Sequence, residues 1–233
     1  MERMTERKPR GFRLVTVQSA HALTRSMQRL RFVGQELHHL ATNDNLHVRP
    51  HLPVTAGPDP VIETRYYTIR SIDAEAGWFD VDFVLHDDGP GANFARQAVP
   101  GMACGVSGPC GLGVKPARHY LLAGDETALP AIARIAESLP KHISGRILIE
   151  AEAPEDRIDF AAPEGVEVEW FYRRSAERSA AFLPRLRAGI DTFRSLPDNF
   201  VWIAGEHEAV MPLRPPLKGV PSLCVPYWRR SDD

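Results

Sequence analysis

The sequence predicts a protein of the β plus α/β class, in which an N-terminal antiparallel β-barrel is followed by a Rossmann-like parallel-sheet α/β domain. In the first half, short segments of alternating polarity are separated by Gly and Pro turns, as is typical of a small antiparallel barrel. From about residue 115 onward, compact apolar segments alternate with stretches of helical periodicity, which indicates βαβ units and a parallel sheet.

The strands expected in the first domain share β-branched and aromatic residues that alternate with polar ones. The pattern is strongest over residues 63–71 and 78–86, and the intervening residues 73–77 have the composition of a hairpin loop. A short helix is expected to begin near Ala92, after a Gly/Pro turn. The other strands are expected at residues 12–17, 27–33, 46–52 and 102–106, and the charged residues 1–10 are expected to be frayed.

The second domain is expected to begin with a compact apolar strand at residues 119–123, followed by a helix. In that helix Leu129, Ile132 and Ile135 repeat at helical spacing. The boundary falls near residues 115–117, which gives domains 1–115 and 116–233, and residues 108–113 are interpreted as the interdomain turn. Further strands are expected at residues 146–152, 166–172 and 200–204, and a second helix at residues 177–187.

Composition narrows the functional classes. The 233 residues are 43% hydrophobic and 25% charged, the ordinary balance of a folded globular protein. The formal net charge of −2 gives no basic field for nucleic acid or an anionic membrane. Three cysteines without CxxC spacing suit a reducing compartment, and no apolar run approaches the ~20 residues of a membrane span. We therefore expect a cytoplasmic protein without membrane insertion.

The first candidate site is the segment Arg65-Tyr66-Tyr67-Thr68 within the strand expected at residues 63–71. A period of two places Arg65, Tyr67 and Ile69 on one face of this strand. A flavin requires an aromatic surface for its ring, a small donor near its N5 atom and a cation for its phosphate, and Arg-x-Tyr-Thr supplies all three. The alternative interpretation is an ordinary amphipathic strand with surface arginines, because short motifs often match by chance.

The second candidate site follows the strand that ends at His86, where Gly89-Pro90-Gly91 precedes the helix expected near Ala92. The free N–H groups of a helix N-terminus preceded by glycines point toward an anion, so this segment is a candidate phosphate cradle. The alternative interpretation is a plain turn between a strand and a helix.

The third candidate site is the turn from Gly124 to Thr127, after the first strand of the α/β domain. The carboxyl end of such a strand is where doubly wound sheets bind nucleotides. Pro130 is tolerated only in a first helical turn, so the helix is expected to start near Glu126 or Thr127, capped by Asp125 or Thr127. The dinucleotide fingerprint GxGxxG is absent from the sequence.

Six segments in order resemble the motifs of the siderophore-interacting proteins, which are FAD-dependent ferric-siderophore reductases of the ferredoxin reductase-like superfamily. The resemblance covers about residues 12 to 230. It implies that the barrel binds FAD and that the second domain is an NAD(P)H-binding-like domain. It also implies that iron(III) held by a siderophore is reduced with electrons from NADPH or NADH, and that ferrous iron is released because oxygen-rich chelators hold it less tightly. The six segments are residues 65–70, 81–95, 107–109, 124–131, 202–206 and 227–229.

The resemblance also assigns roles to single residues. Arg65, Tyr67 and Thr68 would hold the flavin phosphate, ring and N5 region, and His86 would line the flavin. The segment that would meet the pyrophosphate is Gly91, Ala92, Phe94 and Ala95, with Phe94 where the family usually has Trp. The residues that would face the nicotinamide nucleotide are Asp125, Glu126 and Thr127, and the C-terminal aromatic pair near the active site is Tyr227 and Trp228. No catalytic acid, base or metal ligand is assigned.

The substrate side departs from the family. Cys110 stands where relatives often carry a basic residue after Gly-Pro, and Pro212, Pro215 and Pro216 break the helix expected after the Gly-Glu motif. Arg49 is the first substrate-binding candidate and Arg229 the second, both through the resemblance. The four histidines at 38, 39, 47 and 51 are loosely spaced without cysteine between them, so surface or packing roles are favoured over a metal site.

Two alternatives remain open at this point. One is a flavin reductase of other acceptor specificity, fed by NAD(P)H or by ferredoxin, which the absent GxGxxG permits. The other is a siderophore-binding protein that does not turn over.

Overall fold

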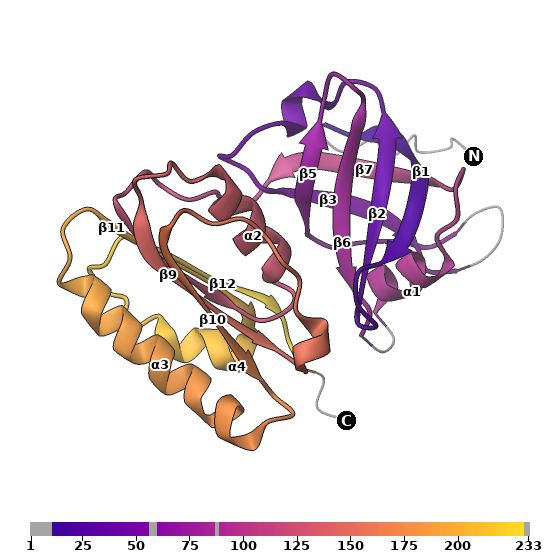
Figure 1. The fold of residues 1–233 in the computed structure, drawn as a ribbon. Helices are drawn as coiled ribbons and strands as arrows, with labels where there is room; N and C mark the ends of the chain where they lie inside the picture. The colour runs from indigo at the N-terminus through magenta and orange to yellow at the C-terminus, as the bar shows by residue number, and fades with distance from the viewer. Residues whose placement is uncertain (1–10, 56–59, 87–88, 231–233) are drawn as a thin grey trace, which may run out of the picture. The chain divides into compact units, whose positions relative to one another are not determined.

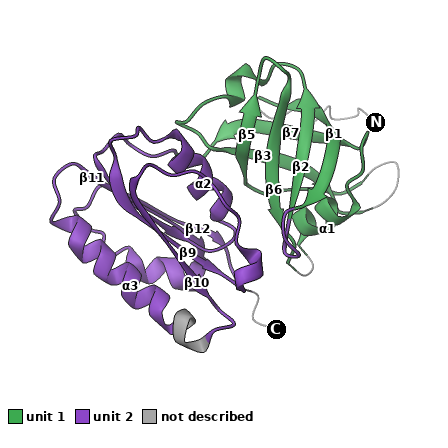
Figure 2. Ribbon diagram, in the orientation of Figure 1, with its two compact units in different colours: residues 1–22, 28–112 green, residues 23–27, 113–233 purple. Residues whose placement is uncertain are grey.

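The computed structural model describes residues 11–55, 60–86 and 89–230, and it leaves the side chains of residues 176–179 undescribed. The N-terminal residues 1–10, which were expected to be frayed, lie outside the described part. The chain forms two compact units (Figure 2). Of the described residues, unit 1 holds those up to Ala22 and those from Gln28 to Leu112, and unit 2 holds Leu23–Met27 and those from Gly113 to Arg230.

Unit 1 is a closed barrel of six strands, as the sequence predicted (Figure 1). The strands are hydrogen-bonded in the order β3-β5-β6-β2-β1-β7, and β7 returns to β3 to close the barrel. A short strand, β4 (Ile62–Thr64), pairs antiparallel with the end of β3. The barrel strands are β1 (Arg13–Ala22), β2 (Met27–Gly34), β3 (His47–Pro53), β5 (Tyr67–Asp73), β6 (Trp78–Val84) and β7 (Ala103–Cys110), with helix α1 (Pro90–Gln97) after β6.

The barrel core follows from the period-two alternation of its strands. Val15 and Val17 of β1 are buried, and Phe32 stacks on Phe79 with ring centroids 5.3 Å apart. Helix α1 adds Phe94 to the same core. A one-turn 3-10 helix (Leu37–Leu40), which the sequence did not predict, also contributes to it. Burial of this contiguous apolar cluster is the main source of the unit's stability.

Two expectations for unit 1 are corrected. The strand expected over residues 63–71 is broken, because β4 ends at Thr64 and β5 begins at Tyr67. Each piece pairs with a different part of β3: Thr64 lies opposite His51, whereas Tyr67 lies opposite Val48. Arg65 and Tyr66 therefore lie in the break, and a period of two does not relate Arg65 to Tyr67. The supposed interdomain turn is also partly strand, since β7 continues to Cys110 through a cis Gly108–Pro109 bond.

Unit 2 is a five-stranded sheet in the order β10-β9-β8-β11-β12, with parallel pairing throughout. Helix α2 (Leu129–Ser138) covers one face, and α3 (Ala176–Arg194) and α4 (His207–Val210) cover the other (Figure 1). The edge strand β12 was not predicted. The strands are β8 (His119–Gly124), β9 (Ser144–Ala151), β10 (Gly165–Tyr172), β11 (Asn199–Glu206) and β12 (Ser222–Trp228).

The helices of unit 2 differ from their predicted bounds. Helix α2 begins at Leu129 rather than near Glu126, because the Asp125 carboxylate accepts the Thr127 N–H and holds the intervening residues in a turn. Helix α3 runs on to Arg194, past Pro184, and Phe182, Leu186, Ile190 and Phe193 are among its core residues.

The proline-rich region ends the next helix as predicted. Helix α4 has four residues and is followed by a 3-10 turn (Met211–Leu213); another 3-10 turn (Pro154–Asp156) follows β9. None of the helices in the described part of the chain has the length and apolar character needed to cross a membrane.

Candidate functional site

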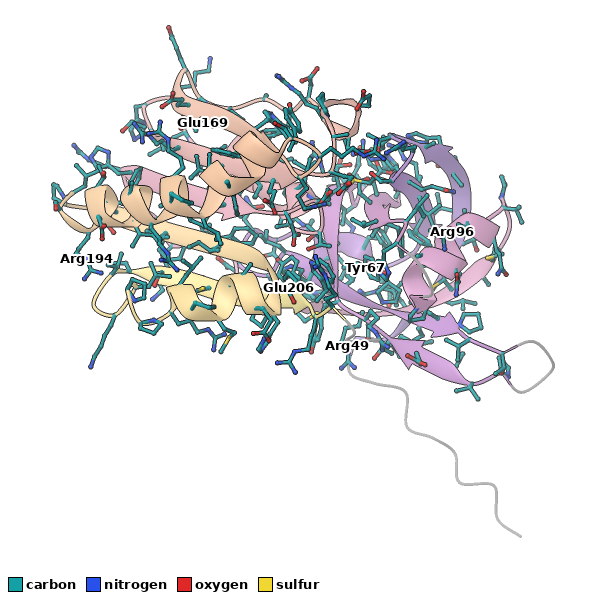
Figure 3. The ribbon with its side chains drawn as sticks, turned by 90° about the horizontal axis from the view of Figure 1, so that it is seen from below. Arg49, Tyr67, Arg96, Glu169, Arg194 and Glu206 are labelled. Atoms are coloured by element: carbon teal, nitrogen blue, oxygen red, sulfur yellow. The ribbon has the colours of Figure 1, made fainter. Side chains whose placement is uncertain are left out.

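The start of helix α1 is lined by glycines against which two ring side chains pack. A Cβ atom added at Gly91 would lie 1.6 Å from Tyr67 Oη, and one added at Gly89 would lie 2.1 Å from His86 Cε1. Only glycine therefore fits at either position while these rings stay in place. The structure thus brings together Tyr67, His86 and the start of α1, three features that the sequence predicted separately (Figure 3 labels Tyr67).

Backbone donors are left over at this helix start. Gly89 caps α1 without a side-chain hydrogen bond, and the first intrahelical bond runs from the Asn93 N–H to the Gly89 carbonyl. The preceding N–H groups, on Gly91 and Ala92, have no acceptor within the helix, and they lie at the positive end of the helix dipole. The arrangement is therefore suited to an anion. Asp87 and Asp88, which belong to the same sequence motif, lie outside the described residues.

The Tyr67 ring packs against the barrel core. Its ring lies 4.3 Å from that of Phe83, centroid to centroid. Burial raises the pKa of the Tyr67 hydroxyl to about 12, although the charge of Arg65 opposes the shift. The hydroxyl is therefore protonated at neutral pH and acts as a hydrogen-bond donor rather than as an anion.

The other predicted flavin residues differ in what they offer a ligand. Arg65 is exposed, and it donates to Glu63 Oε2 at 2.6 Å and to the Thr64 carbonyl at 3.0 Å. Thr68 is buried and lies opposite His47 of β3. The side chains of Ala92, Phe94 and Ala95 are buried in the barrel. Only main-chain atoms of that segment therefore remain for a ligand.

Arg49 lies on unit 1 (Figure 3), where it borders a cavity of about 750 Å³. Its guanidinium donates to Thr64 Oγ1 at 2.5 Å and lies over the Tyr66 ring, 5.1 Å from the ring centroid. The cavity is lined by Gly11, Arg13, His39, Arg49, Tyr66, Ser107, Gly108, Pro109 and Cys110. Cys110, the residue at the departure from the family, therefore borders the same cavity as Arg49.

A second cavity of about 720 Å³ lies in unit 2, at the edge of the sheet where its strands end. Because all strand pairs are parallel, Asp125 after β8, Glu150 near the end of β9 and Glu206 at the end of β11 meet at this edge. This is the edge at which open α/β sheets bind ligands. The lining residues include Gly124, Asp125, Glu150, Glu152, Arg173, Glu206, Glu208, Trp228, Arg229 and Arg230.

Asp125 is fully engaged within the protein. Its Oδ2 atom accepts the Trp228 indole N–H at 2.8 Å and the Glu206 main-chain N–H at 2.9 Å. Its Oδ1 atom accepts both the N–H and the hydroxyl of Thr127, at 2.9 and 2.5 Å. The predicted site residues Asp125, Thr127 and Trp228 are thus brought together, but as partners of one another.

Arg173, which sequence reasoning missed, is bonded to three carboxylates that line or adjoin this cavity. It bonds to Glu126, to Glu152 at 3.1 Å and to Glu150 at 3.4 Å. Burial by itself would lower the pKa of Arg173, but the three carboxylates outweigh that effect and raise it. Burial raises the pKa of Glu126, opposed by the charge of Arg173. Their position in the sequence could have identified this network, because Glu150, Glu152 and Arg173 all lie where predicted parallel strands end.

Arg229 is placed in unit 2, next to the α4 residues His207 and Glu208. Its Nη2 atom lies 3.0 Å from His207 Nδ1 and 3.4 Å from Glu208 Oε1. In the described ranges, no group of three or more His, Cys, Asp or Glu side chains is arranged so that it could hold a metal ion.

Comparison with known proteins identifies both units. Residues 53–112 match the siderophore-interacting FAD-binding domain, and residues 117–231 match the siderophore-interacting protein family. The ferric vibriobactin reductase ViuB of Vibrio cholerae is 30% identical over 197 residues, covering 77% of this chain and 71% of the relative. An uncharacterized protein of Mycobacterium tuberculosis is 40% identical over 197 residues, covering 76% of this chain and 68% of the relative.

Solved structures agree with this result. A siderophore utilization protein from T. fusca superposes with a TM-score of 0.80 at 32% identity, covering 95% of this chain and 94% of that chain. The siderophore-interacting protein SipS from Aeromonas hydrophila superposes with a TM-score of 0.78 at 31% identity, covering 96% and 94% of the two chains. Ferredoxin reductases share the fold at lower identity, as with the enzyme of carbazole 1,9a-dioxygenase at 15% and a TM-score of 0.70. The chain therefore belongs to the siderophore-interacting protein family.

Proposed function

We propose that the protein is an FAD-dependent reductase of iron(III) held in a siderophore or a similar chelate, with NADPH or NADH as the electron donor. The observation that carries the proposal is the contact of Tyr67 Oη with Gly91 at the start of α1. It combines an aromatic surface and a phosphate cradle in the segment that matches a siderophore-interacting FAD-binding domain. ViuB, whose name is ferric vibriobactin reductase, supports the substrate class.

The flavin residues are proposed from unit 1. Tyr67 offers its ring and a protonated hydroxyl, and Arg65 offers an exposed cation for the flavin phosphate. Gly91 and Ala92 offer main-chain N–H groups to the pyrophosphate, because an anion at a helix start is stabilised by the unpaired donors there. His86, packed against Gly89, lines the same edge. Thr68 completes the Arg-x-Tyr-Thr segment next to the N5 region.

The flavin, when bound, supplies the redox chemistry, since it accepts a hydride and returns single electrons. The chain itself orients the ring and neutralises the phosphates. We assign no catalytic acid or base, because electron transfer to chelated iron(III) breaks no bond that needs a proton donor. Ferrous iron then leaves the chelate, because oxygen ligands prefer the harder ferric ion.

The donor site is proposed at the cavity of unit 2. Glu126 and Thr127 follow Gly124 at the carboxyl end of β8, where a nucleotide would approach. Asp125 and Trp228 shape this edge through their mutual hydrogen bond. Arg173 is paired with three carboxylates, so the 2′-phosphate of NADPH would have to displace one of them to reach it. A relative from Escherichia coli named NADPH-dependent ferric-chelate reductase is 31% identical over 137 residues, 50% of its length.

Arg49 of unit 1 and Arg229 of unit 2 are each proposed as a substrate-binding residue. Both carry exposed guanidinium groups, which attract an anionic chelate. Neutralising both should slow the reduction of a ferric catecholate and leave flavin reduction by the donor unchanged.

The test begins with the absorption spectrum of the purified protein, which should show bound flavin. Acid release and chromatography should then identify FAD rather than FMN, because the second, glycine-rich helix start suits a pyrophosphate. Anaerobic titration with NADPH, NADH and reduced ferredoxin identifies the donor, and addition of a ferric catecholate should reoxidise the flavin. Bleaching by reduced ferredoxin alone would replace the nicotinamide donor by ferredoxin.

The same assay with the double variant Arg49→Gln/Arg229→Gln tests whether the two arginines bind the substrate or support the fold. The double variant should keep its flavin spectrum and its half-reaction with the donor, while its rate with ferric catecholates falls and its rate with small neutral acceptors does not. Equal loss with both acceptors would mean that the two arginines support the flavin or the fold. A colourless protein that takes up no FAD would overturn the proposed activity in favour of a binding protein.

A further inference from the structure

Arg13 is the first residue of β1, and its position in the strand places its side chain on the face that carries the barrel core. It stands in the β1 alternation with Val15 and Val17, whose side chains are each 1% exposed. The intervening Leu14 is 66% exposed on the opposite face. Since alternate residues of a strand share a face, the Arg13 side chain lies on the face that carries the core residues.

The guanidinium of Arg13 has buried donors without acceptors. Its Nε and Nη1 atoms are buried, and neither has a hydrogen-bond partner among the described residues. Burial lowers the pKa of Arg13, and the charge of Glu36 opposes the shift. The group stays charged at neutral pH, because the guanidinium pKa lies far above it. A buried charge with unsatisfied donors is unfavourable, and such a group in a folded protein points to an absent partner.

The cavity that Arg13 lines is suited to an anion. Its other ionisable lining residues are His39, Arg49, Tyr66 and Cys110, and it has no carboxylate among the lining residues that the structure describes. Burial raises the pKa of the Cys110 thiol, opposed by the charge of Arg49, so the thiol is neutral and does not repel an anion. Its volume of about 750 Å³ admits a group much larger than a single inorganic ion.

We propose that Arg13 is an anion-binding residue of this cavity, where a rotation of its side chain turns the unpartnered Nε and Nη1 donors toward an anionic oxygen group of the ferric chelate and Arg49 neutralises further charge beside it. The inference rests on the proposed function for the identity of the ligand. In this proposal Arg13 supplies a positive charge to the cavity, whereas Cys110, the residue after Gly-Pro, supplies none. Specificity follows from charge, because the oxygens of a neutral chelate accept hydrogen bonds more weakly and leave the Arg13 charge uncompensated.

The experiment uses FAD-loaded protein and gallium(III) complexes, which copy the charge and shape of ferric complexes but accept no electrons. The probes are the trianionic gallium tris-catecholate and a neutral gallium trihydroxamate, and calorimetry measures their binding. The variants are Arg13→Gln and Arg13→Lys. Arg118→Gln is the control, because Arg118 is an exposed arginine of unit 2 with a long ion pair to Asp198 (3.8 Å).

Arg13→Gln should weaken the catecholate complex about ten- to a hundredfold, the range for hydrogen bonds to a charged group. Arg13→Lys should recover part of this loss, because it restores the charge but not the geometry of the two donors. Arg13→Gln should not change the binding of the trihydroxamate or of FAD. The control variant Arg118→Gln should bind both gallium complexes as the wild type does. Equal weakening of both chelates, or no weakening of either, would overturn the proposal.

Weaker FAD binding in Arg13→Gln, with the chelates unchanged, would assign the cavity to a flavin phosphate and also overturn the proposal. If the variant does not fold, the wild type still decides the question. The gallium catecholate should protect Arg13 from an arginine-specific dicarbonyl reagent, as read by mass spectrometry, and modification at an undiminished rate contradicts the assignment. Gallium binding involves no electron transfer, so a failure of the proposed reductase activity is seen separately from a failure of this anion site.

Discussion

At the scale of single residues, Arg65 is held by a neighbouring carboxylate. Its Nη2 atom lies 2.6 Å from Glu63 Oε2, and both side chains are about half exposed, 52% and 41%. An exposed pair of this kind contributes only ~0–1 kcal/mol, whereas a hydrogen bond to a charged group contributes ~1.5–3 kcal/mol. A flavin phosphate would therefore outcompete Glu63 for Arg65 at a small cost.

We expect Arg65→Ala to weaken FAD binding about ten- to a hundredfold, and Glu63→Gln to leave it unchanged or tighten it by up to about fivefold. The second effect arises because the competing carboxylate is removed. Flavin fluorescence titration measures both changes. Arg70→Ala is the matched control, and equal losses at positions 65 and 70 would contradict the role of Arg65.

At the scale of secondary-structure elements, Asp125 joins three strand ends of unit 2. It follows β8, and it accepts N–H groups from Glu206 at the end of β11 and from Trp228 at the end of β12. Gly205, the residue before Glu206 in β11, has φ +155°, and a Cβ atom there would lie 2.9 Å from Asp125 Oδ2. The edge strand β12 is therefore attached through a carboxylate as well as through its ladder with β11.

Asp125→Asn should destabilise unit 2 by ~1–3 kcal/mol, because each Asp125 oxygen accepts two donors and the amide nitrogen meets a donor in either orientation. Trp228→Phe removes a single bond and should cost less. Denaturant unfolding followed by tryptophan fluorescence measures both. Asp191→Asn, at an exposed position of α3, is the control, and a variant Asp125→Asn as stable as the wild type would show that the carboxylate is not needed here.

At the scale of the whole molecule, the two units have separate apolar cores. Val81 belongs to the core of unit 1 and Leu148 to that of unit 2. A chain with two cores is not expected to unfold as a single two-state system. Since the proposed flavin residues lie on unit 1, bound FAD should stabilise that unit selectively.

Calorimetry should resolve two unfolding transitions, and FAD at a hundred times its Kd should stabilise one of them by ~2.7 kcal/mol. Val81→Ala should lower the FAD-sensitive transition and Leu148→Ala the other, because each leaves a cavity in one core. A single transition that responds to FAD and to both substitutions would show that the units unfold together.

Much of this architecture was predictable because local patterns determine it. The alternation in β1, β5 and β6 and the helical spacing in α2 identified both units, and the glycines at 89 and 91 marked the start of α1. The break at Arg65 was not predictable, because it depends on how β4 and β5 register against β3. Strand β12 was missed because Pro226 lies within it, and proline is tolerated in a strand mainly at a sheet edge.

The candidate sites divide in the same way. The flavin segment was visible because Tyr67 and Thr68 are adjacent in sequence. The network around Arg173 was not, because Glu126, Glu150 and Glu152 reach it from other strand ends. Likewise, the unpaired donors of Arg13 follow from its burial, and a single arginine near the start of a strand gives no sign of burial in sequence.

The sheet order of unit 2 also has a consequence during synthesis on the ribosome. Strand β8 is the central strand, and its neighbour β11 begins at Asn199, about 75 residues after β8 ends at Gly124. At ~5–20 residues per second, a nascent chain needs roughly 4–15 s to make that stretch. During this interval β9 can cover only one edge of β8, and the other edge, next to the apolar Leu121 and Leu122, stays open to any strand nearby. Newly made protein is therefore most prone to aggregate before translation reaches β11, and slower elongation over residues 125–198 would lower the yield of native protein more than the same delay within the barrel.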